Sequence, residues 1–496
     1  MENRIPQEEL NSHLWNAAVL LRTYIDAGSY KQYIFPLLFF KRLSDVYDEE
    51  TAEALEASGG DAEFAALPEN HSFAIPDGAH WSDVRETTEN VGKAIVDAFR
   101  SIEAANDSKL RGIFGDAAWT NKKRLPDHLL KDLIEHFSAE TLSIANCPED
   151  ELGQGYEYLI KKFADDSGHT AQEFYTNRTV VHLMTEILQP RTGESIYDPT
   201  CGSAGMLISA IAHLKQHGKE WRNVHAYGQE INQLSSAIGR MNLFLHGVED
   251  FEIANDDTLR HPAFLEAGRL RTFDMVLANP PYSIKQWDRE SFASDPYGRN
   301  FLGTPPQGRA DYAFIQHILK SMDPKSGRCA ILLPHGVLFR NEESEMRERL
   351  VKSDLVEAVI GLGANLFFNS PMEACILICR SEKAPKRRKR ILFINATAEV
   401  TRKNAQSYLE PHHIEKIVEA YRSDEDIECF SFHATIDEIE RNAFSLSIPL
   451  YVKSPNDENA DDRSIEETVE DWKTASIKAM SLLDGIAVKL RENDGE

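Results

Sequence analysis

Between residues 190 and 400, short apolar runs alternate with stretches in which apolar residues recur at helical spacing. Runs of four to eight apolar residues are typical of buried strands, and the helical stretches between them predict crossover helices. This alternation indicates a doubly wound α/β sheet with helices on both faces. Strands are expected at 195–197, 224–227, 273–278, 329–333, 355–360, 374–379 and 391–394, and helices at 204–213, 233–245, 312–319 and 344–351.

The last two expected strands, 374–379 and 391–394, are separated only by residues 380–390. A parallel pair needs a longer crossover connection, usually a helix. The two strands are therefore predicted to form an antiparallel hairpin at one edge of the sheet.

Helical sequence flanks the sheet region on both sides. Residues from about 8 to 150 read as mostly helical, with a break at Gly28-Ser29. The pattern is helical again after residue 400, and 461–491 is expected to be helical for most of its length. We therefore expect a helical N-terminal domain at 1–155, an α/β domain at 156–400, and a helical C-terminal region for subunit contacts at 401–496.

The charge of the chain limits how it could hold nucleic acid. Lysine and arginine number 54 against 80 acidic residues, which gives a formal net charge of −26. A protein that grips DNA alone is normally basic, because neutralised phosphates supply most of the non-specific affinity. A nucleic-acid function would therefore need a local basic patch or another subunit.

Cysteine and histidine placement argues against a metal site or a disulfide framework. The six cysteines include no Cys-x-x-Cys pair. The histidines are scattered, and His335, His412 and His413 lack a carboxylate at metal-binding spacing, so no metal site is predicted. No segment reaches the roughly 18 apolar residues of a membrane helix, and the first ten residues contain no apolar signal region. The expected compartment is the cytoplasm.

One candidate ligand loop follows the first expected strand and opens the next helix. Its glycines would let a ligand approach the backbone at the carboxyl end of a strand, where open α/β sheets bind ligands. The spacing is neither that of the dinucleotide fingerprint nor that of a P-loop, and an ordinary strand–turn–helix junction is the alternative. The expected ligand contacts are Asp198, Thr200, Cys201, Gly202, Ser203, Ala204 and Gly205.

Two acidic positions follow later strands. Glu230 comes directly after the strand 224–227, where a carboxylate can accept hydrogen bonds from both hydroxyls of a ribose. The alternative is a carboxylate that favours the start of a helix through its dipole. Asp257 precedes the next clear strand and could accept a bond from an adenine amino group, or simply cap a turn.

The motif that decides the chemistry is Asn279-Pro280-Pro281-Tyr282, at the end of the strand 273–278. An adenine N6 amine is a poor nucleophile because its lone pair is delocalised into the ring. The Asn279 side-chain oxygen and the Pro280 carbonyl can each accept one of its N–H bonds, which disperses the charge that builds during attack. Tyr282 offers a flat face on which an extruded base can stack. The alternative is a stiff Pro-Pro turn after a buried strand.

Together these residues resemble the amino-methyltransferases, a Rossmann-like family. Residues 198–205 look like its cofactor loop, and 279–282 like its catalytic [DNS]-P-P-[FYW] motif. The segment 172–178 is similar to the family's extra cofactor motif, although Asn177 stands where proline is usual. The resemblance adds six cofactor contacts, namely Glu173, Phe174, Tyr175, Thr176, Asn177 and Arg178.

The order of these motifs narrows the resemblance. The extra motif comes first, then the cofactor loop, then the catalytic motif, as in the gamma arrangement of DNA adenine methyltransferases. Four further segments resemble the modification (M) subunits of type I restriction–modification systems: 35–43, 308–317, 360–367 and 447–452.

The resemblance implies an M subunit that transfers a methyl group from S-adenosylmethionine to N6 of adenine in DNA. A specificity (S) subunit would read the sequence, a restriction (R) subunit would complete the cleaving complex, and a second M subunit is expected. The acidic charge agrees with a catalytic chain that needs a partner to hold double-stranded DNA. A methyltransferase acting on protein glutamine or RNA adenine, or a non-catalytic assembly subunit that binds the cofactor, stays open.

Three other features have two interpretations each. The basic cluster at 383–390 could contact phosphate or protect a sheet edge in solvent. The loop 291–308 could order over an extruded base, with Trp287 as a stacking residue, or be an ordinary surface loop. Cys201 is interpreted as a small loop residue and not as a nucleophile, because the chain contains no Pro-Cys dipeptide.

Overall fold

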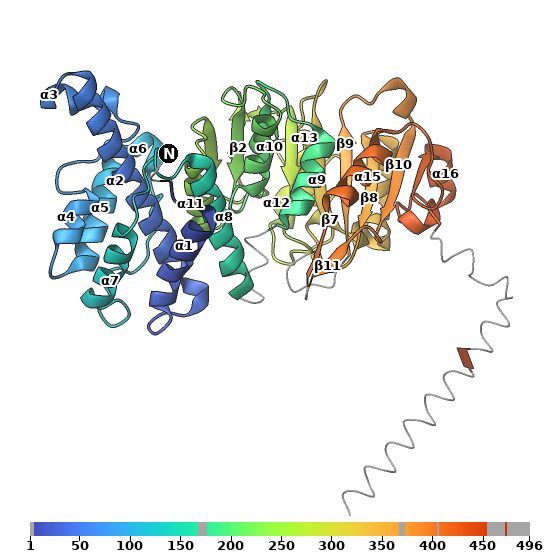
Figure 1. Ribbon diagram of the computed structural model, residues 1–496. Helices are drawn as coiled ribbons and strands as arrows, with labels where there is room; N and C mark the ends of the chain where they lie inside the picture. The colour runs from blue at the N-terminus through green and yellow to red at the C-terminus, as the bar shows by residue number, and fades with distance from the viewer. Residues whose placement is uncertain (1–3, 167–175, 367–372, 404–405, 454–471, 474–496) are drawn as a thin grey trace, which may run out of the picture.

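The computed structural model describes residues 4–166, 176–366, 373–403, 406–453 and 472–473. Helices gather at the N-terminal end of the molecule, and the remainder is built around one sheet (Figure 1). The predicted α/β class with a preceding helical region is confirmed. The predicted helix at 461–491 lies almost wholly outside the described residues.

The N-terminal helices pack around α2, the longest of them. Its residues 33–40 are buried on every side of the helix, so it forms the centre of the core that these helices share. The helices of this region are α1 (Gln7–Leu21), α2 (Lys31–Ala57), α3 (Ala62–Ala65), α4 (Trp81–Glu86), α5 (Val91–Ala105), α6 (Asp107–Leu110), α7 (Asp127–Ser138) and α8 (Glu149–Asp166), with 3₁₀ turns η1 (Ala27–Ser29) and η2 (Pro68–Asn70).

Two buried cations follow the apolar run of α2. Arg42 is only 6% exposed and donates from Nη1 to the carbonyls of Leu142, at 2.6 Å, and Cys147, at 2.7 Å. Lys41 pairs with Asp45, and Asp45 also accepts the backbone N–H of Leu142 at 2.6 Å. Buried charges are tolerated when they are paired or hydrogen-bonded in this way. They fix the segment that leads into α8 against α2.

Within the described residues, nine strands form one sheet in the order β13-β10-β8-β9-β7-β6-β1-β2-β3. Seven strands run parallel, while β9 and β13 run antiparallel to their neighbours. The strands are β1 (Ser195–Asp198), β2 (His225–Gln229), β3 (Phe251–Ala254), β6 (Met275–Ala278), β7 (Arg328–Pro334), β8 (Val356–Leu362), β9 (Ala374–Arg380), β10 (Arg390–Ala396) and β13 (Ser431–Thr435). Two small antiparallel pairs lie apart from it: β4 (Leu265–Glu266) with β5 (Arg269–Leu270), and β11 (Thr401–Lys403) with β12 (Gln406–Tyr408).

The predicted edge hairpin of 374–379 and 391–394 is wrong in its pairing. β9 lies inside the sheet, between β7 and β8, and β10 pairs with the far side of β8 in parallel. The antiparallel hairpin that does form joins β8 to β9. The physical reason is visible in β9, whose first six residues are all buried, as expected of a strand covered on both faces.

The sequence predicted a helical region after residue 400. That prediction is incomplete, because β13 lies in this region and forms one edge of the sheet. β13 pairs with β10 from Arg390 opposite Thr435 to Ile394 opposite Ser431. Its sequence, Ser-Phe-His-Ala-Thr, contains too few apolar residues to stand out, which is typical of an edge strand.

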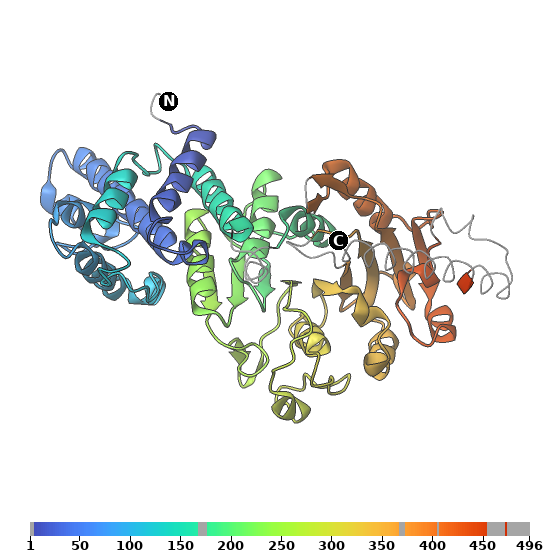
Figure 2. The same ribbon diagram turned by 90° about the horizontal axis from the view of Figure 1, so that it is seen from below.

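Helices cover both faces of the sheet (Figure 2). The apolar side chains of α9, α10 and α15 share one core with the strands, while those of α13, α14 and α16 share the core on the opposite face. The helices of this part are α9 (Arg178–Leu188), α10 (Gly205–Gln216), α11 (Gln233–Leu245), α12 (Arg289–Ala293), α13 (Asp311–Lys320), α14 (Ser344–Lys352), α15 (Pro411–Arg422) and α16 (Ile436–Arg441), with 3₁₀ turns η4 (His335–Leu338), η5 (Asn341–Glu343), η6 (Pro385–Arg387) and η7 (Ile448–Leu450).

Helix α11 belongs to two cores at once. Ala237, Ile238, Met241 and Leu245 join the core of the N-terminal helices, whereas Leu243 packs in the core beneath α10. The helical N-terminal part is therefore attached to the sheet through a helix of the sheet itself. Among the described helices, none has both the length and the apolar character needed to cross a membrane.

Candidate active site

The four parallel strands β6, β1, β2 and β3 are consecutive neighbours in the sheet. Asn279 follows β6, Asp198 ends β1, Glu230 follows β2, and Asp257 lies three residues after β3. Because the carboxyl ends of parallel strands meet at one edge, the structure brings the predicted catalytic and cofactor residues to the same side of the sheet.

The predicted catalytic turn contacts the predicted extra cofactor motif. Asn279 Nδ2 donates to Thr176 Oγ1 at 2.9 Å, and the Tyr282 hydroxyl donates to Asn279 Oδ1 at 3.0 Å. Asn279 and Tyr282 are half-buried, Pro280 is buried and Pro281 is exposed, so the asparagine lies at the sheet edge and not in the core. Burial raises the pKa of Tyr282 well above its usual value, which keeps its hydroxyl a hydrogen-bond donor.

A buried carboxylate that sequence reasoning missed supports this turn. Ser283, directly after the motif, has a left-handed φ of 51°, and its N–H donates to Asp311 Oδ1 at 2.8 Å. Asp311, which is 1% exposed, also pairs with Arg340 at 2.8 Å. Asp311 begins α13 and lies in the segment 308–317 that resembles the family, but nothing in its local pattern points to the catalytic turn 28 residues earlier.

The predicted cofactor loop is held by backbone contacts to β2 and its end. Cys201 N–H donates to the Gln229 carbonyl at 3.0 Å, and Gly202 N–H donates to Glu230 Oε2 at 3.1 Å. Gly202 and Ala204 both adopt left-handed backbone, with φ of 51° and 62°. An alanine in that region is strained, and such strain concentrates at functional loops.

Helix α11 lies directly against this loop. Asn242 Nδ2 donates to the Ser203 carbonyl at 2.8 Å and to Glu157 Oε1 of α8 at 2.7 Å. A Cβ atom at Gly239 would lie 2.8 Å from the Gly202 carbonyl oxygen, closer than real Cβ atoms approach backbone. Glycine at 239 therefore sets how closely α11 approaches the loop.

We expect Gly239→Ala to weaken binding of S-adenosylmethionine by about tenfold or more, because the methyl group must push α11 or the loop backbone away. Isothermal titration calorimetry measures the affinity. Gly28→Ala is the matched control, since a Cβ there meets nothing within 4 Å. Equal affinity in the two variants would show that the loop tolerates the displacement.

The side chains of Asn177 and Arg178 contact other segments of the chain. The Asn177 amide donates to the carbonyls of Leu366, at 3.0 Å, and Ser407, at 3.1 Å, and its Oδ1 accepts from the backbone and hydroxyl of Thr179. Arg178 pairs with Glu157 and covers the start of α10 at Gly205. These contacts position the motif. Glu173, Phe174 and Tyr175 of the same motif lie outside the described residues.

Asp257 caps a turn, which was the alternative interpretation of this position. Its Oδ1 accepts the N–H groups of Leu259 at 2.9 Å and Arg260 at 3.2 Å. The neighbouring Thr258 hydroxyl donates to the Pro199 carbonyl at 2.5 Å, which ties this turn to the cofactor loop. Asp257 itself is half-buried and lies at the predicted cofactor edge.

A buried arginine fixes the loop 291–308. Arg299 pairs with Asp295 at 2.6 Å and donates to the carbonyls of Thr258 and Leu259, at 2.9 and 2.8 Å. The loop is thereby tied to the segment that contains Asp257. Trp287, which one of the two interpretations of this loop made a stacking residue, donates its indole N–H to the Gln307 carbonyl at 3.0 Å.

Asp198 is a buried carboxylate at the start of the predicted cofactor loop, with 2% of its surface exposed. Its Oδ1 accepts the Thr200 N–H at 3.0 Å. Burial, with a further contribution from the nearby Glu230 carboxylate, raises the pKa of Asp198 to about 7. A cationic group of a ligand beside it would favour the charged form.

The raised pKa predicts a pH-dependent stability. An unfolded aspartate titrates near pH 3.9, so between about pH 4 and 7 the folded chain keeps a proton that the unfolded chain loses. Stability therefore falls as pH rises through this window. Without ligand, we expect Asp198→Asn to match the parent chain at pH 4 and to exceed its free energy of unfolding by about 4 kcal/mol at pH 8, because the pKa is raised by about three units at about 1.4 kcal/mol each.

Asparagine keeps the oxygen that accepts the Thr200 N–H, so the comparison isolates the charge. Denaturant unfolding at the two pH values measures the effect. Identical stability of the two proteins at pH 8 would contradict a strongly raised pKa.

The structure also bears on Cys201 and on the basic cluster at 383–390, for which the sequence left two interpretations each. Burial raises the pKa of the Cys201 thiol well above its usual value, in agreement with a small loop residue and not a nucleophile. In the basic cluster, Lys383 and Arg387 are buried and donate to backbone carbonyls, and Lys386 pairs with Asp424 at 3.0 Å. Two of the six cations of that cluster therefore turn toward the protein, and the other four are exposed.

Comparisons with known proteins show the family of this chain. The profile described as N-6 DNA Methylase matches residues 148–460, and that of the HsdM N-terminal domain matches 10–137. This chain belongs to the N-6 DNA methylase family. Within it, the chain is a methylase subunit of the type I restriction enzyme group, as the sequence resemblance predicted.

Three relatives of this methylase cover from 74% to 97% of its length. The MjaVII methylase subunit of Methanocaldococcus jannaschii is 29% identical over 97% of this chain and 83% of its own. The HindI methylase subunit of Haemophilus influenzae is 31% identical over 74% of this chain and 84% of its own. The type I restriction–modification methyltransferase subunit from Streptococcus thermophilus superimposes with a TM-score of 0.79 at 32% identity, covering 90% of this chain and all of that one.

Proposed function

We propose that this methylase binds S-adenosylmethionine at the carboxyl edge of β1, β2 and β3 and methylates N6 of an adenine held beside Asn279. When bound, the cofactor supplies a methyl group on a sulfonium, so the leaving group needs no separate activation. The observation that supports the proposal best is the direct contact between the catalytic turn and the cofactor motif, from Asn279 to Thr176.

The hydrogen-bond acceptors at this edge of the sheet suit this ligand. Glu230 uses its two carboxylate oxygens for the backbone N–H groups of Gly202 and Asn232. Each carboxylate oxygen has room for a second hydrogen bond, so two ribose hydroxyls can still be accepted. Buried Asp198 presents a carboxylate beside the loop, where it can attract a cationic amine. Thr200, Cys201, Ser203, Ala204 and Asp257 remain proposed contacts, and Thr176, Asn177 and Arg178 would hold the loop around the ligand.

At the catalytic turn, Asn279 Oδ1 accepts one bond from Tyr282 and has a second lone pair for the adenine amine. The carbonyl of Pro280 is the proposed second acceptor. Two acceptors localise the amine lone pair and stabilise the positive charge that develops on nitrogen. The Tyr282 ring is the proposed platform for the extruded base, since an adenine inside a duplex cannot reach the turn.

The remaining proposals concern partners. With a net charge of −26, and with two of the six cations of its basic loop buried, this chain is poorly suited to hold DNA alone. We propose that an S subunit supplies sequence recognition, that a second M subunit and an R subunit complete the assembly, and that the complex acts on double-stranded DNA in the cytoplasm.

The test is transfer of a tritiated methyl group from S-adenosylmethionine. The full chain is assayed with its neighbouring S gene product on DNA that contains or lacks the target adenine, and separately on RNA and on protein. Label that appears only in N6-methyladenine of DNA supports the proposal. Label in RNA or protein would favour the alternative substrates, and binding without transfer to any of them would favour a non-catalytic assembly subunit.

A further inference from the structure

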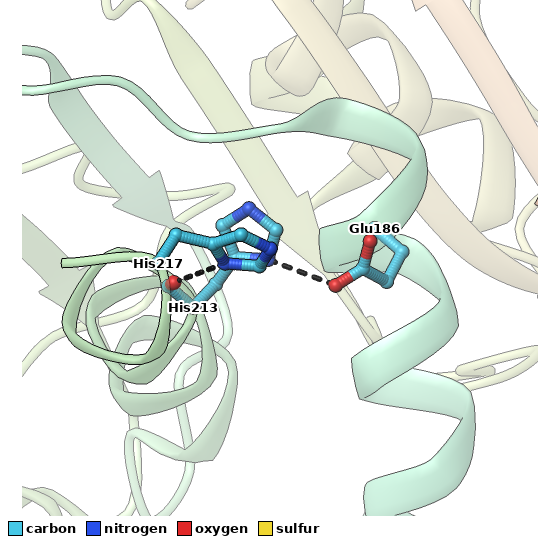
Figure 3. Close-up of side chains that lie close together, drawn as sticks. All are labelled: Glu186, His213 and His217. Carbon is cyan, nitrogen blue, oxygen red and sulfur yellow. Dashed lines mark hydrogen bonds and ion pairs between the residues drawn. The ribbon is translucent and has the colours of Figure 1, made fainter. Parts of the chain in front are cut away.

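The last turns of α9 and α10 bring together three side chains with metal-ligating atoms. Glu186 comes from α9, His213 from α10, and His217 is the residue that ends α10 (Figure 3). In the part of the chain that the structure describes, a ligand atom from each lies within 4.8 Å of the other two. No metal site was predicted from the sequence, and these three residues were not among the candidates.

The three side chains already lie almost as close together as the ligands of a metal ion. His213 Nδ1 lies 2.9 Å from Glu186 Oε1, His217 Nδ1 lies 2.7 Å from the His213 carbonyl oxygen, and the two imidazole centroids are 4.2 Å apart. In a tetrahedral zinc site with bonds of about 2.0–2.2 Å, ligand atoms stand about 3.3 Å apart. Small side-chain rotations would therefore admit an ion.

The residue types and spacing suit a borderline divalent metal. Histidines four positions apart on a helix face the same side, and a carboxylate from the adjacent helix adds an oxygen ligand. His213 is 7% exposed, while His217 is exposed, so one side of the cluster is open to water or a fourth ligand.

The surroundings favour a cation. Glu186 lines a groove of about 600 Å³ between α9 and α15, together with Glu410, Glu415 and Glu419. Arg178 and Arg422 are the arginines of the same lining. Four carboxylates against two guanidiniums leave the groove negative at neutral pH, which raises the local concentration of divalent cations.

We propose that Glu186, His213 and His217 bind a divalent transition-metal ion, Zn²⁺ in the first instance, that joins α9 to α10. His213 lies eight residues after Gly205, so the site is about 12 Å along α10 from the cofactor loop. The ion would hold the two helices whose opposite ends carry Asn177 and the cofactor loop. It is a structural site, independent of the methyl-transfer assignment.

The test uses the full chain without a histidine tag, after treatment with a chelator. Co²⁺ is added first, because bound Co²⁺ gives visible absorption bands that report its geometry, and Zn²⁺ then displaces it in a titration. We expect one high-affinity site per chain and a rise in melting temperature on Zn²⁺ addition, since a ligand that binds only the folded state stabilises it.

Three variants make the test specific. His217→Ala removes an exposed ligand, and Glu186→Gln removes the charge while keeping an oxygen beside His213; each is expected to weaken Zn²⁺ binding about tenfold or more. The matched control is His225→Ala, an exposed histidine that pairs with Asp250 at 2.6 Å outside the cluster. If the cluster variants bind Zn²⁺ and gain melting temperature as the parent and His225→Ala do, the proposal is wrong, and Glu186 and His213 form only a hydrogen bond between helices.

Discussion

Replacement of Asn279 by alanine should reduce methyl transfer by about 10²–10³-fold while S-adenosylmethionine binds almost as in the parent chain. The loss follows because Asn279 Oδ1 is the proposed acceptor that stabilises charge on the amine, an interaction needed chiefly in the transition state. Turnover is measured by incorporation of labelled methyl groups, and cofactor affinity by calorimetry.

Two matched variants separate this role from the support that Asn279 gives to its neighbours. Asn279→Asp keeps an oxygen for the Tyr282 hydroxyl and can accept a bond from Thr176, so it should retain more activity than the alanine variant. Tyr282→Phe keeps the ring and loses the hydroxyl bond to Asn279, and should retain most of the activity. Wild-type turnover in Asn279→Ala would overturn the mechanism.

Replacement of Arg299 by methionine should destabilise the protein by about 3–5 kcal/mol. The side chain is 2% exposed and its removal leaves Asp295 as a buried, uncompensated charge. It also removes the bonds to the carbonyls of Thr258 and Leu259. Denaturant unfolding, followed by fluorescence, measures the change in the free energy of unfolding.

Arg85→Met is the control for this prediction. Arg85 pairs with Glu135 at 2.6 Å, but both side chains are about half exposed, so its loss should lower the stability far less than the loss of Arg299. Adding Asp295→Asn to Arg299→Met should recover part of the stability, because the orphaned charge is removed. Equal losses of stability in Arg85→Met and Arg299→Met would contradict the role of Arg299 as the buried partner of Asp295.

Local sequence patterns were sufficient for most elements of the sheet and for the position of the turn at 279–282. The helix expected at 233–245 has those bounds in the structure, and the strand before Asn279 ends where predicted. These elements have a clear apolar period or a run bounded by turn residues. The position of Asn279 and Glu230 at strand ends then follows from the parallel sheet itself.

Strand pairing was harder to predict because it depends on contacts between distant segments. The hairpin prediction used only the short connection between 374–379 and 391–394, although the unbroken apolar run of the first strand pointed to a central place. The polar network around Glu157, Asn242 and Ser203 joins residues up to 85 positions apart. It has no local periodicity, so no pattern in the sequence reveals it.

The same separation explains why Glu186 was missed. It lies 27 residues before His213, and only the packing of α9 on α10 joins them. The His-x-x-x-His spacing of 213 and 217 was a usable signal, but the helix expected at 204–213 ended before His217. Without the carboxylate, the spacing indicates a metal site only weakly.

The shared helix α11 has a consequence for gene exchange between relatives. One side of this helix completes the hydrophobic interior of the first 150 residues, and Gly239 on another side touches the loop expected to hold the methyl donor. A hybrid that joined the N-terminal helices of one relative to the remainder of another would pack the apolar side chains of one protein against an α11 from the other. Such hybrids should work best when the α11 positions 237, 238, 241 and 245 are exchanged together with the N-terminal helices.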